Sequence, residues 1–146
     1  MNRKPLDSLK QAIADLTSTL KVNETYLAGF LSVTEKSLNE WKKLGMGDAT
    51  PKAYRLIRLH EVTGYLKSKH PEVPQSAYKA LIENGRIVTD PNDLEEGSIS
   101  LLNFITEDPH SKTWVPCVEE VVREFIKSNL KEMERSREAH QSIRHA

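Results

Sequence analysis

Apolar residues recur at steps of three and four positions along most of the chain, which is the spacing of amphipathic helices. The first run predicts a helix that ends before Asn23. Similar short runs follow as far as about residue 128, and only one brief segment suits a strand. The pattern therefore predicts an all-α protein. The apolar positions of the first helix are Leu6, Leu9, Ile13, Leu16 and Leu20.

Residues 24–43 carry the pattern of two short helices that cross near a right angle and bury side chains against each other. Ala28 supplies the small side chain needed where the helices approach closely. The break comes at residues 32–34, and Thr34 is expected to cap a second helix whose first turn carries Glu35. Ser32 stands where glycine is common, so we expect its backbone conformation to carry some cost. The apolar positions of this predicted helix-turn-helix are Leu27, Leu31, Val33, Leu38 and Trp41.

A longer helix is expected next, with Thr50 as its cap and Pro51 at its first helical position, continuing to about residue 69. The sequence His-Pro-Glu-Val-Pro at residues 70–74 then breaks the chain. We place a domain boundary here.

A shorter helix is predicted over residues 75–84, stopped by Gly85 in the left-handed conformation that glycine favours. Residues 86–89 suit a strand or an extended connection, and residues 90–94 are turn-like. Another short helix is expected to end at Asp108-Pro109. Its apolar positions are Ile99, Leu102, Phe104 and Ile105.

The last helix is predicted to start near Pro116. The pattern thins beyond Ser128, and from Glu134 we expect fraying or disorder. Its apolar face either closes its own domain or offers a dimerisation surface. That face contains Val118, Val121, Val122, Phe125 and Ile126.

The expected organisation has three parts. Residues 1–70 form a helix-turn-helix DNA-binding domain, residues 71–130 a smaller helical region for partner binding or dimerisation, and residues 131–146 a frayed or disordered tail. The sequence leaves open whether residues 71–120 fold separately or pack on the first helices.

The formal net charge is zero, but the charges are segregated along the chain. Residues 34–70 hold eight basic and four acidic side chains, a balance of +4, whereas residues 71–120 hold three and ten, a balance of −7. A local basic field can therefore drive contact with DNA despite the zero total. The acidic segment is available for a protein partner, or it consists of ordinary solvated helix faces and loops.

In helix-turn-helix proteins, residues just after the turn and one turn further on point at base edges. Asn39 could read adenine and Lys36 could reach guanine acceptors, whereas Glu35 and Glu40 repel phosphate unless they accept from a cytosine amine. The positions expected at base edges are Thr34, Glu35, Lys36, Asn39 and Glu40. Those expected at phosphates are Ser37, Lys42, Lys43, Arg55 and Arg58.

Other chemistry finds little support in the sequence. The one cysteine, Cys117, excludes an internal disulfide and a multi-cysteine zinc site, and its apolar neighbours favour a buried thiol. No two of the five histidines have the i, i+4 spacing of helical metal ligands, and no nucleophile motif occurs. We therefore expect no enzyme, no metal and no cofactor. The chain shows no signal-peptide pattern and no spanning apolar run, so a soluble cytoplasmic protein is expected.

The run at residues 27–43, together with Arg55-Leu56-Ile57-Arg58-Leu59, resembles the DNA-binding half of Xre-type regulators. In particular it is similar to antitoxins of the ParS and MbcA kind, and the resemblance covers residues 24–59 only. It implies a homodimeric repressor that sits on a palindromic operator while its C-terminal half engages a partner, which in an antitoxin is the toxin.

The sequence thus favours a sequence-specific DNA-binding regulator, either an autoregulating repressor or an antitoxin that binds double-stranded DNA as a dimer. One alternative is a helical adaptor or inhibitor that acts through the acidic C-terminal half and does not bind DNA. Another is a structural helical hairpin in a small architectural protein, because this hydrophobic spacing also recurs by chance.

Overall fold

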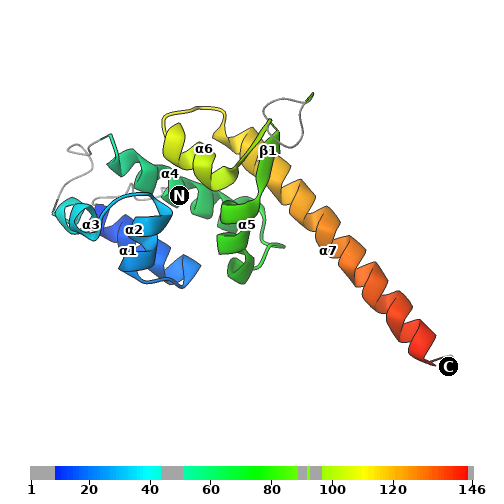
Figure 1. Cartoon of the computed structure of the whole chain (residues 1–146). Helices are drawn as coiled ribbons and strands as arrows, with labels where there is room; N and C mark the ends of the chain where they lie inside the picture. Colours follow the sequence, from blue (N-terminus) through cyan, green and yellow to red (C-terminus); the bar gives the residue numbers. More distant parts are fainter. Residues whose placement is uncertain (1–8, 44–50, 89–91, 93–96, 145–146) are drawn as a thin grey trace.

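Helices make up most of the protein, as the apolar spacing predicts (Figure 1). The computed structural model describes residues 9–43, 51–88, 92 and 97–144, with side chains described as far as Asn129. The elements are α1 (Leu9–Leu20), α2 (Glu24–Phe30), α3 (Glu35–Trp41), α4 (Ala53–Lys69), the 3₁₀ helix η2 (Gln75–Ala77), α5 (Tyr78–Asn84), β1 (Arg86–Val88), β2 (Ser98–Ser100), α6 (Leu101–Glu107) and α7 (Trp114–Arg144).

The N-terminal bundle forms because α1 presents one apolar stripe to α2, α3 and α4. Its predicted core positions from Leu9 onward, namely Leu9, Ile13, Leu16 and Leu20, are all buried. Leu6 and the expected cap Thr50 lie outside the described residues. The helix predicted to start at Pro51 starts at Ala53 instead, because residues 51–55 first make an i, i+3 turn in which the Tyr54 amide donates to the Pro51 carbonyl at 3.3 Å.

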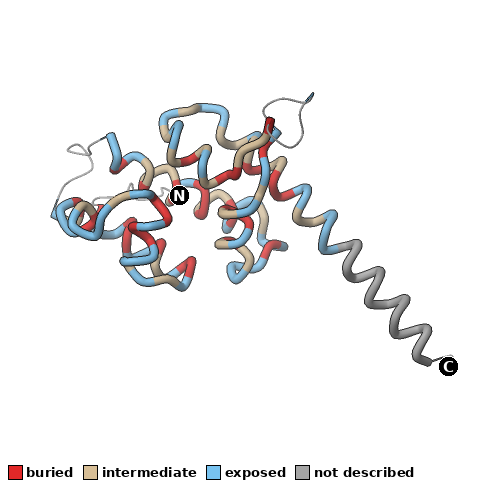
Figure 2. The backbone as a smooth tube through the Cα atoms, in the orientation of Figure 1, coloured by how far each residue is buried: buried red, intermediate tan, exposed pale blue. Residues whose placement is uncertain are grey.

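The two halves of the chain share one hydrophobic core, which answers the question that the sequence left open (Figure 2). Leu59 and Leu66 of α4 belong to the same buried cluster as Tyr78, Ile105 and Val122 from the C-terminal half. Helix α4 also packs against α6. The break at residues 70–74 is therefore a turn within one packed unit in the described part of the chain.

A small hairpin in the C-terminal half was only partly predicted. The possible strand at residues 86–89 is found as β1, and it pairs antiparallel with β2. The prediction that Ile99 belongs to a helix was wrong, because Ile99 lies in β2 opposite Ile87. Helix α6 starts only after Ser100, whose hydroxyl oxygen accepts from the Asn103 amide at 3.1 Å.

The prediction of a left-handed Gly85 was also wrong. Its φ and ψ are −62° and 130°, which any residue can adopt. The glycine is required for space instead, because an added Cβ would lie 2.2 Å from the Val121 Cγ1 atom and 2.4 Å from the Leu81 carbonyl oxygen. Gly85 therefore allows α7 to pack closely on the end of α5.

Helix α7 starts at Trp114, two residues before the predicted Pro116, and continues to Arg144. Residues 131–144 are thus helical where a frayed or disordered tail was expected. The segment after Pro116 contains no glycine or proline and is rich in strong helix formers, so local propensity continues the helix beyond the apolar pattern. Val118, Val121 and Val122 are buried in the protein's own core, whereas Phe125 and Ile126 are half-buried.

A polar cluster joins the end of α4 to the start of α7. The Tyr65 hydroxyl donates to Glu119, and the ring nitrogens of His70 lie 2.9 Å from Glu119 Oε1 and 3.0 Å from Glu72 Oε1. Because a neutral imidazole donates through only one nitrogen, two carboxylate contacts favour the imidazolium. Burial is the largest single influence and by itself favours the neutral ring, but the hydrogen bonds to Glu72 and Glu119 outweigh it and raise the pKa of His70 above its usual 6.5.

We predict that Gly85→Ala destabilises the protein by about 1–3 kcal/mol, because the new methyl group collides with Val121 and with backbone. The matched control is Gly29→Ala in α2, where an added Cβ meets nothing within 4 Å. This change should stabilise the protein by about 0.5–1 kcal/mol, since alanine is the better helix former. Chemical denaturation measures both, and an equal effect of the two changes would contradict the packing argument.

We predict that the stability provided by His70 depends on pH. A raised pKa in the folded state means that this stability is fully present below pH 6.5 and is lost as pH rises through the raised value. The pKa values of Glu72 and Glu119 are lowered, so both remain ionised in this range. Urea midpoints from about pH 6 to about pH 8.5 should fall in the unmodified protein and stay flatter in His70→Gln. An equal fall of the urea midpoint with pH in both proteins would show that His70 is not the group responsible.

Candidate nucleic-acid interface

Helices α2 and α3 are each started by a side-chain cap. The Asn23 side-chain oxygen accepts from the Tyr26 amide at 2.8 Å, and the Thr34 hydroxyl oxygen accepts from the Ser37 amide at 3.1 Å. Glu24 and Glu35 occupy the first turns, where a carboxylate favours the positive end of the helix. The predicted Thr34 cap is confirmed, whereas the Asn23 cap was not predicted.

The turn between the two helices closes in the left-handed conformation expected for Ser32. Its φ is 57°, and its amide donates to the Gly29 carbonyl at 3.1 Å while the Val33 amide donates to the Ala28 carbonyl at 2.9 Å. These two bonds form a Schellman motif, which normally carries glycine at the left-handed position. The serine Cβ therefore costs some energy here.

The core of the pair follows the predicted apolar pattern. Ala28 is 3% exposed, so α2 and α3 approach each other closely, and α1 packs against both helices. Val33 is half-buried and packs against the core. The buried predicted positions are Leu27, Leu31, Leu38 and Trp41.

The opposite face of α3 is open to solvent and lies at the end of the molecule away from the C-terminus of α7 (Figure 1). The hydroxyls of Thr34 and Ser37 are bonded to each other at 3.0 Å within the cap, so they contribute mainly to the local structure. The residues of α3 and its C-terminal turn that are exposed are Glu35, Lys36, Asn39, Glu40 and Lys43.

Two further lysines flank this face. Lys42 is half-buried, and its Nζ lies 2.5 Å from Glu24 Oε1, which ties the end of α3 to the start of α2. Lys52 is exposed and lines a hollow with Ser37 and Glu40 of α3. Lys52 was counted in the basic segment but not among the predicted site residues. The sequence alone does not show that the residues just before α4 lie beside α3.

The structure gives the two arginines of the Arg-Leu-Ile-Arg-Leu sequence internal contacts. Arg55 donates to the Leu31 carbonyl at 3.1 Å and to the Ser32 carbonyl at 3.3 Å, and thereby closes the turn between α2 and α3. Arg58 donates to the Pro109 and Ser111 carbonyls at 2.9 and 3.0 Å.

The Arg58 guanidinium also pairs with Glu61 at 3.1 Å and lies 5.2 Å from the centre of the Trp114 ring. Its side chain is only 12% exposed. Arg58 thus holds the loop between α6 and α7, whereas Arg55 closes the turn before α3. Neither role could be predicted from the sequence, because the acceptor carbonyls are distant in the chain.

Clusters of metal-ligating side chains and the thiol of Cys117 are two further candidates for chemistry in the described residues. Within them, no group of three or more histidine, cysteine, aspartate or glutamate side chains could hold a metal ion. Burial, and then the charge of Glu120, raise the pKa of the half-buried Cys117 thiol, which disfavours the reactive thiolate. None of the helices that the structure describes is long and apolar enough to cross a membrane.

Comparisons with protein-family models, with curated protein sequences and with solved structures find no match to this chain. What the protein does is therefore inferred from its own residues and geometry.

We predict that Ser32→Gly stabilises the protein by about 0.5–1 kcal/mol, because glycine adopts a φ of 57° without the Cβ clash. Ser32→Ala is the control, since alanine keeps the Cβ and should change stability little. Denaturant titration distinguishes them. A glycine variant that is no more stable than the alanine variant would show that Ser32 is not strained.

Proposed function

We propose that the chain is a sequence-specific DNA-binding transcription regulator and that α3 enters the major groove. The observation that carries the proposal is the pairing of α2 and α3 across a left-handed turn, with one face of α3 buried and the other open. That arrangement is the one in which the second helix of a helix-turn-helix reads bases. The resemblance of residues 24–59 to Xre-type regulators supports the same function.

Base reading is assigned to Lys36 and Asn39. Both are exposed, and their spacing of three residues puts them on the same face of α3. An asparagine amide matches the donor and acceptor of adenine, and a lysine ammonium donates to the guanine acceptors. Glu35 and Glu40 flank them and repel phosphate unless each accepts from a base amine, most typically that of cytosine, so they favour sites with cytosine at those positions.

Phosphate contacts are assigned to Lys43 and Lys52, which are exposed beside α3. Lys42 can join them only by exchanging Glu24 for a phosphate. Thr34 and Ser37 place the start of the helix at the groove, and Arg55 holds the turn behind it. Arg58 is no longer proposed as a DNA contact, because its N–H donors are occupied by carbonyls within the protein.

The proposed regulator acts as a homodimer, because one small reading head contacts few bases and two heads a helical turn apart multiply affinity and discrimination. An autoregulating repressor or an antitoxin fits best, with operator DNA upstream of its own gene. In the antitoxin case the C-terminal half, whose segment at residues 71–120 carries the charge balance of −7, engages the toxin.

We predict that the purified full-length protein prefers duplex DNA from immediately upstream of its own gene over scrambled duplex, and that binding weakens with salt. Lys36→Ala and Asn39→Ala should each reduce the preference by about 1–3 kcal/mol, because each removes a base contact. Lys43→Ala should weaken binding to both duplexes and lower the log–log salt slope by about one. Fluorescence anisotropy at two salt concentrations measures all three.

The control is Lys112→Ala, an exposed lysine between α6 and α7, which should leave binding to both duplexes unchanged. Absence of any preference at either salt concentration would contradict the proposal. The helix-turn-helix would then be a scaffold, and an adaptor acting through the acidic half would become the better explanation.

A further inference from the structure

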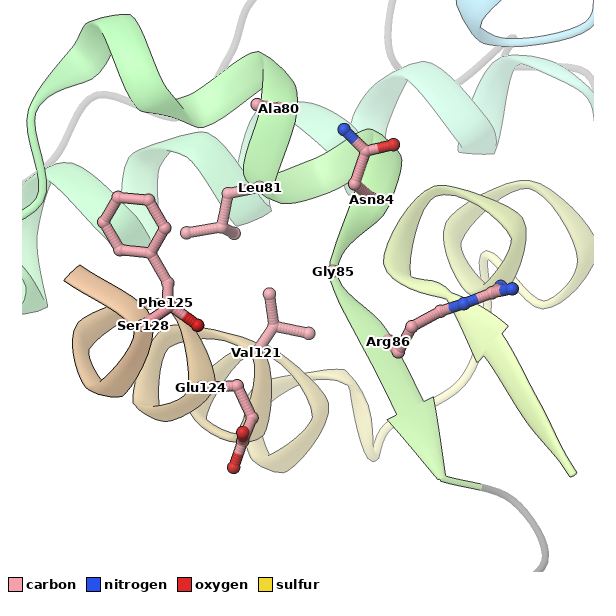
Figure 3. A pocket seen from close by; sticks show the side chains of 9 residues that line it. All are labelled: Ala80, Leu81, Asn84, Gly85, Arg86, Val121, Glu124, Phe125 and Ser128. Atoms are coloured by element: carbon pink, nitrogen blue, oxygen red, sulfur yellow. The ribbon is translucent and has the colours of Figure 1, made fainter. Parts of the chain in front are cut away.

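A hollow lies at the end of the molecule away from α3. It is a groove of about 710 Å³ between α5, the start of β1 and α7, which we call the α5–β1–α7 groove (Figure 3). Leu81 and Val121 form its buried floor, and the half-buried Phe125 forms one wall. Ala80 is exposed at its edge. An apolar floor beside open edges is typical of an interface core.

The charged groups at the edge of this groove are self-complementary. Arg86 lies on β1 and Glu124 on α7, on opposite sides of the line from Gly85 to Val121 (Figure 3). Both are exposed, and Glu124, at 67%, makes only a loose contact of 3.5 Å with Lys127 on its own helix. In a two-fold interface the same patch meets itself, so a contact between the arginine of one copy and the glutamate of the other would occur twice.

Helix α7 itself extends past the groove. Ser128 is the last residue that lines the groove, yet the helix continues to Arg144 and leads away from the rest of the molecule (Figure 1). Its 31 residues span about 46 Å. Helices in water depend on tertiary packing, and the elements that contact α7 in its own chain, among them α4, α5, α6 and β1, lie along its first half. A second helix beside it would supply the missing packing.

We propose that the α5–β1–α7 groove is the homodimer interface, and that its occupant is α7 of a second copy of this chain, running antiparallel across a two-fold axis. In that arrangement the grooves of the two copies face each other, and the part of each α7 beyond Ser128 packs along the other copy. The inference deepens the proposed function, because it supplies the second reading head and leaves both α3 helices free. The dimer interface can be tested in the absence of DNA.

The test is sedimentation equilibrium of the full-length protein without DNA. The expected mass is twice 16.6 kDa. Arg86→Glu and Glu124→Arg should each raise the dimer Kd on the order of tenfold or more, because each change sets two pairs of like charges against each other. The double variant Arg86→Glu with Glu124→Arg should restore the Kd of the unmodified protein.

A second variant, Ala80→Arg, tests the groove by size rather than by charge. Ala80 is exposed at the edge of the groove, so a larger side chain there does not disturb the fold. The arginine should fill the groove and give a monomer. Lys112→Glu, an exposed change outside the groove, is the matched control and should leave the Kd unchanged. Circular dichroism confirms that each variant is folded.

A monomeric unmodified protein at every concentration would overturn the proposal, and so would a double variant that stays as weak as the single ones. The outcome is independent of the DNA result. A monomer that still prefers its upstream duplex would overturn the interface and the proposed homodimer but not DNA binding, whereas an intact dimer without duplex preference would overturn only the proposed DNA binding.

Discussion

The contact between Arg55 and the end of α2 is the interaction on which the proposed site depends most. Where α2 ends, the carbonyls of Leu31 and Ser32 accept from the Arg55 guanidinium, at 3.1 and 3.3 Å. Helix ends leave such carbonyls unsatisfied, and a charged donor satisfies them strongly. Because Ser32 holds a left-handed conformation at some cost, this contact also supports the turn that sets the direction of α3. Helix α3 is thus positioned by α4.

Helix α4 in turn joins the two halves of the protein. Three residues after Arg55, Arg58 holds the loop before α7 through the carbonyls of Pro109 and Ser111. Near the other end of α4, Tyr65 donates to Glu119 of α7, and the adjoining His70 contacts the same carboxylate. One helix therefore contacts the turn before α3 and the start of α7. This provides a physical route by which a partner bound to the C-terminal half could alter α3.

The sequence predicted the features that depend on local pattern. Helical periodicity located the apolar faces, the Thr34 cap was correct, and the strain at Ser32 followed from the missing glycine. The errors concern features that depend on packing between distant segments. Strand β2 has only three residues, too few to show an alternating pattern, and Gly85 was assigned a turn role because its neighbour Val121 is remote in sequence. Arg58 was assigned to DNA since no pattern reveals its carbonyl partners.

The proposed function requires that α3 contacts DNA through its open face. Amide NMR spectra of the labelled protein, recorded with and without the preferred duplex, test this contact because they report each residue separately. The largest shifts should fall on residues 34–43 and on Lys52, with little change over residues 75–88. Shifts concentrated in the acidic half, or spread evenly along the chain, would contradict it.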